Sequence, residues 1–360
     1  MKTLTWACAA TCVVACAARG NGAKGELIQR RYHWQAGMTT YERAVTTSDM
    51  TMGEGAEARP SHDVMAMLTR QEVYSVKDDG TGRVATTFVR VRTEKDKGGS
   101  KEMVFDSAEP EKATDEMGKK AWGALVGRTY IMEIAPDGRV IRQEGFSEIF
   151  DGMFGAMEVP KDARDTPEMG EKFAKMREGM REGFKKDLGQ MMPGMPGIVG
   201  GELGQDRRVG EEWTSEKEAN VPMLGTMKWR TTNKVVSLEN VDGRRIVTTS
   251  SKGNQDSNKG SNKEQGKDGM MAGMFGVMGV SMKMDMHGES SSIEVFDLDR
   301  GRMVRSESTR KSNGTMTITL PDIGGKGAGA AKEETKKFTG TTKTVTELVG
   351  PEEAILPGVK

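Results

Sequence analysis

The sequence predicts a mainly β protein of the α+β class. Two related antiparallel β-meander halves are expected to form a curved sheet or half-barrel, with an amphipathic helix between them. Short runs rich in Val, Thr and aromatic residues recur along the 360 residues, and turns that contain Gly separate them. This pattern is typical of strands joined as hairpins. The order of the runs repeats once along the chain, and the middle segment has apolar residues at helical spacing instead.

The first half, residues 31–148, is predicted to be a meander of hairpins. In the clearest hairpins, a turn that contains Asp and Gly connects two runs enriched in β-branched residues. A helical stretch that ends near Gly123 is expected to interrupt the strands. The predicted strands are residues 65–77, 83–92, 101–106, 130–135 and 139–143.

The second half, residues 206–349, has the same order of features, which predicts a duplication. The motif Val-Gly-Glu-Glu-Trp at residues 209–213 resembles the segment around Gly37 that opens the first half. Both halves then contain a strand, a turn, a returning strand and a strand that ends in Phe-Asp. The matching pairs are Gly80 with Gly243, Phe105 with Phe296, and Asp106 with Asp297.

Two segments of the second half are predicted to lack regular structure. Residues 253–269 form a polar insert rich in Gly, Ser, Asn and Lys, and residues 324–334 form a Gly/Ala/Lys linker. Such compositions contain too few apolar side chains to offset the entropy of ordering them. Residues 350–360 are expected to be a loose tail.

A Met- and Gly-rich helical connector, residues 149–205, is predicted between the halves. Its strongest helix covers residues 167–188, with Thr166 as the N-cap, Pro167 in the first position and Gly189 after the end. Because each internal Gly weakens a helix by about 1 kcal/mol, the helix is expected to need a surface to pack on. Its apolar stripe is Met169, Phe173, Met176, Met180, Phe184 and Leu188, of which Phe173, Met176, Met180 and Phe184 are the candidate ligand-binding residues.

The N-terminus predicts export. Residues 1–15 have the layout of a signal peptide, and their apolar run is shorter than the about 20 residues that span a bilayer. Cys16 ends the run Val-Val-Ala-Cys, which resembles a lipobox, so we expect Cys16 to be lipidated and residues 16–30 to be a tether. Ordinary signal cleavage in this region is the alternative. The expected location is the periplasm or outer membrane, lipid-anchored rather than free, and no disulfide is expected because every Cys lies in residues 1–16.

Charge and motifs exclude several function classes. Lys plus Arg and Asp plus Glu both total 53, and this balance argues against a nucleic-acid partner. No nucleophile elbow, zinc-protease motif or phosphate-binding loop is present, so we expect a non-enzymatic protein without a cofactor. An enzyme that uses Asp106 or Asp297 is the minor alternative. The favoured interpretation is that each carboxylate bonds nearby backbone at the end of a strand.

One pattern of residues could hold a metal. Met282, Met284, Met286 and His287 provide soft ligands of the kind that suits Cu(I), so a Met-based copper-binding periplasmic protein is an alternative function. The favoured interpretation is a strand in which alternate Met side chains face the core. The chain has 28 Met and only 5% aromatic residues, which favours Met as its general core filler.

Several of these motifs together resemble a family of bacterial exported proteins, often lipoproteins, that is known only as a domain of unknown function. The motifs are the aromatic-Gly strand at residues 34–41, Phe-Asp-Ser at residues 105–107, Val-Gly-Glu-x-Trp at residues 209–213, and Phe-Asp-x-x-x-Gly-Arg at residues 296–302. They are structural motifs, so the resemblance implies no catalytic residue. A weaker architectural likeness is to envelope lipid-carrier lipoproteins, in which a curved sheet surrounds an apolar concavity.

We therefore expect a cell-envelope protein that binds an apolar small molecule or a protein partner and contacts the membrane through its lipid anchor. A structural or interaction protein without a ligand is a further alternative.

Overall fold

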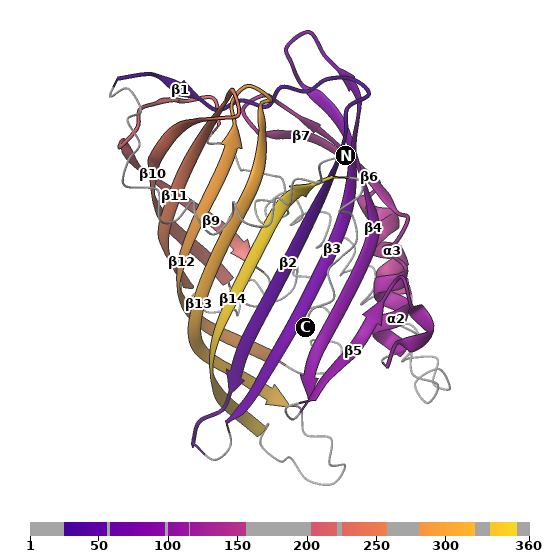
Figure 1. Ribbon diagram of the computed structural model, residues 1–360. Helices are drawn as coiled ribbons and strands as arrows, with labels where there is room; N and C mark the ends of the chain where they lie inside the picture. The colour runs from indigo at the N-terminus through magenta and orange to yellow at the C-terminus, as the bar shows by residue number, and fades with distance from the viewer. Residues whose placement is uncertain are drawn as a thin grey trace.

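The computed structural model describes residues 25–55, 58–97, 100–114, 116–155, 203–221, 225–257, 281–320 and 332–350, and a single large antiparallel sheet dominates these residues (Figure 1). The sheet contains 12 strands, is strongly curved and stays open. The predicted mainly β fold with a curved sheet is therefore confirmed.

The first half contains β1 (Ile28–Gln29), β2 (Thr39–Met52), β3 (Arg59–Val76), β4 (Gly82–Lys97), β5 (Ser100–Asp106), β6 (Thr129–Ile134) and β7 (Val140–Glu144). Its helices are η3 (Pro110–Lys112), α2 (Glu116–Gly123) and α3 (Phe146–Gly155). The second half contains β8 (Asp206–Arg207), β9 (Glu212–Val221), β10 (Gly225–Val241), β11 (Arg244–Ser257), β12 (Ser281–Asp297), β13 (Arg302–Leu320) and β14 (Lys332–Val349).

The two meanders are joined edge to edge by the first long strand and the last strand. The strand order is β7-β6-β4-β3-β2-β14-β13-β12-β11-β10-β9, and β5 pairs with β4 beyond this path. β2 and β14 pair from Tyr41 with Val349 to Met52 with Phe338. β1 and β8 form a separate short ribbon near the upper end of the sheet, which is the end shown at the top of Figure 1.

Backbone hydrogen bonds confirm the predicted relation between the halves. In the first half, Gly37 N–H donates to the carbonyl of Val73 at 2.8 Å. In the second half, Gly210 N–H donates to the carbonyl of Val235 at the same distance. Both glycines have positive φ, +80° and +85°, a conformation that glycine adopts without strain. β2 and β3 therefore correspond to β9 and β10.

Two further features repeat. β3 is irregular between Val73 and Ser75, and β10 is irregular between Val235 and Ser237. Such bulges bend a strand and increase its twist, so they contribute to the curvature of both halves. The Phe-Asp pairs also match, because Phe105 and Phe296 are both fully buried at the ends of β5 and β12. After Phe296 the chain forms a tight hairpin, whereas after Phe105 it forms η3 and α2, as the sequence predicts.

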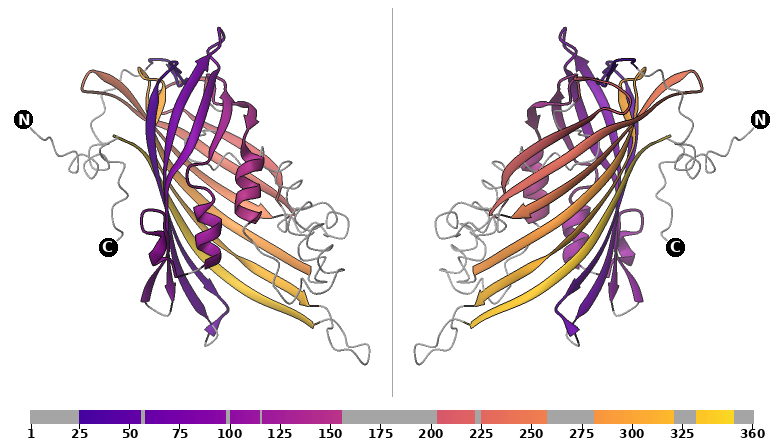
Figure 2. Two further views of the ribbon diagram at one scale, coloured as in Figure 1. Left: turned by 90° about the vertical axis from the view of Figure 1, so that its right-hand side faces the viewer. Right: turned by 90° about the vertical axis from the view of Figure 1, so that its left-hand side faces the viewer.

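The sheet has two distinct faces. In β10, Met227, Asn233 and Val235 are buried, whereas the alternating Lys228 and Lys234 are exposed. We call the face of Met227, Asn233 and Val235 the concave face and the opposite one the outer face, which on β3 also has buried residues, Val64, Ala66 and Leu68. Helices α2 and α3 lie on the concave side, next to the strands of the first half (Figure 2).

The main core fills the upper end of the concave face. Ile28, Tyr32 and Trp34, from the segment before β2, pack there with apolar side chains of both halves. Trp34 Nε1–H donates to the carbonyl of Ile134 at 3.1 Å, and His33 N–H donates to the carbonyl of Gly301 at 3.0 Å. This segment thus crosses the concave side and ties the first half to the second.

Glycines let the lower part of the second half curve. Gly253, Gly288, Gly314 and Gly340 lie on the concave face of four neighbouring strands, β11 to β14. A Cβ atom on Gly314 would meet the carbonyl of Asp285 and would approach the ring of Phe338 to 2.9 Å. The Phe338 ring therefore covers the bare backbone of Gly314, a known way to stabilise a bent sheet.

Some predicted boundaries differ from the structure. β11 continues to Ser257, so the first residues of the predicted insert, 253–257, belong to a strand. β14 begins at Lys332, inside the predicted linker. α3 begins at Phe146, before the predicted start of the helical connector at residue 149. The predicted helix at residues 167–188, the signal peptide and the tail after residue 350 lie outside the described residues.

Candidate functional site

A belt of hydroxyl groups crosses the concave face below the core. Each belt residue pairs with the next across neighbouring strands, so the side chains form one continuous row. Thr46 and Thr344 hydroxyls are 3.1 Å apart, and Ser251 Oγ donates to Asn233 Oδ1 at 2.6 Å. The belt is polar because its side chains are hydroxyls and one amide, and it has no net charge because none of these groups ionises. From β2 to β10, the row is Thr46, Thr344, Ser308, Ser292, Ser251 and Asn233.

Arg310 lies one row below this belt, in the middle of β13. By register, Thr342 and Ser290 are its direct neighbours on β14 and β12. The Arg310 side chain is exposed, and no carboxylate of the described residues pairs with its guanidinium. Partial desolvation by the surrounding sheet shifts the pKa of Arg310 downward, and no charged group contributes to this shift. Arg310 is therefore an isolated cation on the concave face.

Apolar side chains line the concave face below Arg310. Phe338 is buried, and Met50, Met286 and Met316 are half-buried. They come from β14, β2, β12 and β13, so they form one surface that crosses the junction of the two halves. None of them belongs to the main core cluster at the upper end. The described helices pack on the first-half strands and leave this surface uncovered by any described element.

Glu42 is the most perturbed titratable group in the described part of the chain. It lies on the concave face of β2, between Thr69 of β3 and Leu348 of β14. Its side chain is buried, and its Oε1 atom has no hydrogen-bond partner among the described residues. Burial raises the pKa of Glu42 from 4.5 to about 8, so the carboxyl is mostly protonated at neutral pH. The same enclosed environment raises the pKa of Tyr130.

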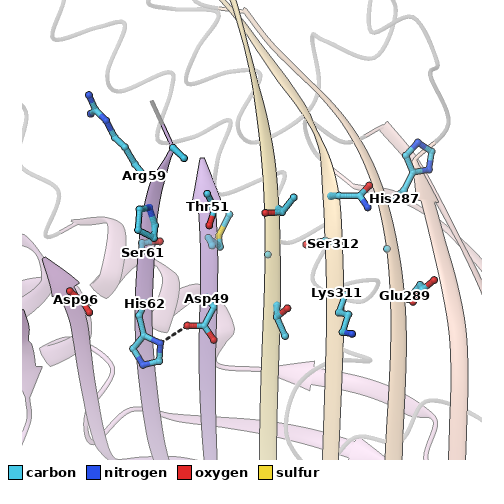
Figure 3. Close-up of a pocket in the computed structure, with 18 of the residues that line it drawn as sticks. Asp49, Thr51, Arg59, Ser61, His62, Asp96, His287, Glu289, Lys311 and Ser312 are labelled. Carbon is cyan, nitrogen blue, oxygen red and sulfur yellow. Dashed lines mark hydrogen bonds and ion pairs between the residues drawn. The ribbon is translucent and has the colours of Figure 1, made fainter. Parts of the chain in front are cut away.

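The outer face also contains a recess, with a volume of about 1140 Å³ (Figure 3). Its lining combines charged and polar side chains with apolar groups such as Met50 and Pro60. One of its rows alternates in charge across the neighbouring strands from β9 to β3. That row is Glu216, Arg230, Asn254, Glu289, Lys311, Thr341, Asp49 and His62.

Both histidines of the recess already have partners. His62 Nδ1 lies 2.6 Å from Asp49 Oδ1, as Figure 3 shows, and His287 Nδ1 lies 2.8 Å from Asp256 Oδ1. Asp49, Asp256 and His287 are exposed. Exposed ion pairs of this kind contribute little to stability and are typical of a solvated surface. The two histidines are therefore engaged, whereas Arg59, Glu289 and Lys311 of the lining have no side-chain partner among the described residues.

The matching carboxylates Asp106 and Asp297 have the structural role that the sequence favours. Asp106 Oδ1 accepts from Ala108 N–H at 2.9 Å, and Asp297 Oδ1 accepts from Arg300 N–H at the same distance. Burial alone would raise the pKa of Asp106, but the Arg90 guanidinium and the backbone donor hold it below its ordinary value. Both carboxylates therefore fasten a turn at the end of a strand.

Of the four residues of the copper alternative, His287 occupies a position on the opposite face of β12 from the three Met positions. Met282, Met284 and Met286 occupy alternate positions of β12, opposite residues of β13. His287 follows Met286 directly, lies on the outer face and contacts Asp256. Among the described residues, no group of three His, Cys, Asp or Glu side chains could hold a metal ion.

The remaining predicted site residues, Cys16, Phe173, Met176, Met180 and Phe184, lie outside the described residues. In the part of the chain that the structure describes, no helix is both long enough and apolar enough to cross a membrane.

The comparison with protein families identifies the class. The model of a family of unknown function, DUF6263, matches residues 79–302, which is more than half of the chain. The chain therefore belongs to this family, and the predicted membership of a domain of unknown function is confirmed. No curated protein matches the chain in sequence.

Solved structures give only distant likenesses. A structure of lipovitellin, described by its lipid–protein interactions, is 8% identical with a TM-score of 0.41; the similarity covers 88% of this chain but 25% of the lipovitellin chain. The outer membrane protein OprG from Pseudomonas aeruginosa is 7% identical, with 88% and 97% coverage and a TM-score of 0.19. A DUF1329 protein from Desulfovibrio piger is 8% identical, with 86% and 84% coverage and a TM-score of 0.15. At these TM-scores the likenesses carry no conclusion about function.

Proposed function

We propose that this protein is a non-enzymatic binding protein that holds an apolar ligand against the concave face of its sheet. The observation that carries the proposal is the surface formed by Met50, Met286, Met316 and Phe338. These side chains are apolar, lie apart from the main core and are not covered by any described helix, and the Lys336–Glu334 ion pair borders them beside Met316. Met side chains are flexible and polarizable, and they adapt to apolar partners of varied shape.

The outer face supports this choice by contrast. Its recess contains many charged and polar side chains beside its apolar groups, and its two histidines are engaged by Asp49 and Asp256. Apolar ligands bind mainly through apolar surface with a few polar groups that fix their orientation. Among the described surfaces, the concave face has this composition, with the hydroxyl belt and Arg310 as its polar groups.

A binding assay with a fluorescent apolar probe tests the proposal. The change is Met316→Gln on the concave face, and the matched control is Ile293→Gln on the outer face, where Ile293 is 46% exposed. We expect Met316→Gln to weaken probe binding by about tenfold, because it places an amide in an apolar contact. Equal probe binding by both variants, with unchanged thermal stability, contradicts the proposal.

The proposal includes a place in the cell envelope, with attachment through a lipid on Cys16. Support for this part comes from the sequence alone, namely the apolar run of residues 4–15 followed by the lipobox-like Cys16. The expected result is that the protein fractionates with membranes and that Cys16→Ser releases it. If the unmodified protein is found in the soluble fraction, Cys16 does not hold the protein at a membrane.

A further inference from the structure

We propose that Arg310 is the headgroup anchor of the concave face and that the ligand of this face is a long-chain monocarboxylate, that is, a fatty acid. The inference rests on the proposed function and names its ligand class. The concave face presents a cation without a counter-ion, and the apolar surface begins directly below that cation.

Two acidic groups of the concave face above Arg310 are already neutralised, and the next charged residues of the Arg310 row, Asp63 and Lys95, lie three and four strands away. Glu294 lies two rows above the Arg310 row and pairs with Arg30, with Nη1 and Oε2 3.1 Å apart. Glu42 is mostly protonated at neutral pH. The Arg310 guanidinium has neither a hydrogen bond nor an ion pair within the described part of the chain. A negatively charged group of the ligand can therefore serve as the counter-ion of Arg310.

Residues with hydroxyl groups occupy the sheet positions that neighbour Arg310 on the concave face. Thr342 and Ser290 lie directly across on the neighbouring strands, at a Cβ separation of about 5 Å, and Ser308 and Ser312 lie two residues away on β13. An arginine fork donates two parallel hydrogen bonds to a carboxylate. The two carboxylate oxygens have lone pairs left over for neighbouring hydroxyl donors. This environment therefore matches a carboxylate in both charge and hydrogen bonding.

The polarity of the face gives the ligand a direction. Above Arg310, the rows contain Ser308, Ser292 and then Glu294, which are polar. Below it, the rows pass Gly314 and reach Met316, six residues along β13 or about 20 Å at the usual rise per residue. The acyl chain therefore runs from Arg310 toward the lower end of the sheet, over the glycines and the surface of Met and Phe338.

One cation favours one anionic charge. A phosphate monoester carries about −1.5 to −2 charges at neutral pH, and a single guanidinium would leave part of that charge uncompensated. No second described cation lies within the neighbouring positions of the Arg310 row, which are Ser48, Thr342, Ser290 and Gly253. A monocarboxylate carries the one negative charge that balances Arg310, and lysophosphatidylglycerol, a phosphate diester with the same charge, tests the alternative.

Isothermal titration calorimetry on the purified, delipidated protein tests the inference. The probes are palmitate, the neutral hexadecanol and lysophosphatidylglycerol. The variant is Arg310→Gln, and the matched control is Arg230→Gln, which removes the same charge from the outer face. Palmitate is expected to bind Arg310→Gln about tenfold to a hundredfold more weakly, because a charge-assisted bidentate pair is lost. Hexadecanol should bind both variants equally, and Arg230→Gln should bind palmitate like the unmodified protein.

The possible failures are distinguishable. Equal palmitate binding by Arg310→Gln and Arg230→Gln overturns the anchor but leaves the proposed function standing if hexadecanol still binds. Tighter, Arg310-dependent binding of lysophosphatidylglycerol overturns the choice of a carboxylate. If the unmodified protein binds none of the three probes, the proposed function fails with the inference.

Discussion

Glu42 and Arg310 are single residues whose importance comes from their position on the sheet. In the sequence, both lie in strand segments where polar or charged residues alternate with other residues. Strand alternation places them on the same side as neighbouring Thr and Ser residues, but it does not tell which side is concave. Burial of Glu42 depends on the neighbouring β3 and also on β6 and β14, and the last two are distant in sequence. This is why neither residue was a predicted site.

Because the Glu42 carboxyl is buried, we expect an unusual pH dependence of the stability of the fold. Its pKa is about 8 in the fold against 4.5 as the ordinary value, so the folded state holds the proton more tightly than the unfolded chain. The resulting stabilisation is fully present below about pH 4.5 and is lost as the pH rises through 8. Glu42→Gln keeps a similar shape but does not titrate.

Urea denaturation of both proteins between pH 5 and 8 measures this effect. The free energy of unfolding of the unmodified protein should fall relative to that of Glu42→Gln over this range, by no more than about 5 kcal/mol. Parallel pH profiles of the two proteins would mean that Glu42 is ionised in the fold and has a partner.

At the scale of elements, the segment that precedes β2 holds the two halves together. Trp34 packs against Gly82 at the start of β4, and a Cβ atom on Gly82 would overlap the Trp34 side chain. The backbone of His33 makes the equivalent close approach to Gly301 at the start of β13. The hairpins beside these glycines were predictable from local turn residues. The crossing segment was not, because its contacts are non-local.

Gly82→Ala should therefore destabilise the fold. The added methyl group must push Trp34 out of its place, and overpacking of this kind costs about 1–3 kcal/mol. Gly350→Ala is the control, since a Cβ atom there has nothing within 4 Å. Chemical denaturation of the two variants gives the comparison. Equal free energies of unfolding would show that Trp34 can move without cost.

At the scale of the whole molecule, two related meanders share one open sheet. The duplication was readable from sequence because its marks are local: the Gly37 and Gly210 turns and the two Phe-Asp pairs. The pairing of β2 with β14, which joins the halves, was not predictable from the sequence. Neither strand has a residue pattern that indicates which strand it pairs with. That joint matters for the proposed function, because it makes the apolar surface and the hydroxyl belt continuous across both halves.

An apolar ligand bound on the concave face would contact the Met side chains of that face. NMR of the protein with methyl-labelled Met, titrated with palmitate, tests this contact most directly, because Met residues lie on the concave face and in the core. We expect shifts for Met50, Met286 and Met316, whereas Met132, which is 3% exposed and belongs to the main core, should be unaffected. Unchanged signals of the three concave-face residues at saturating palmitate would contradict the proposal.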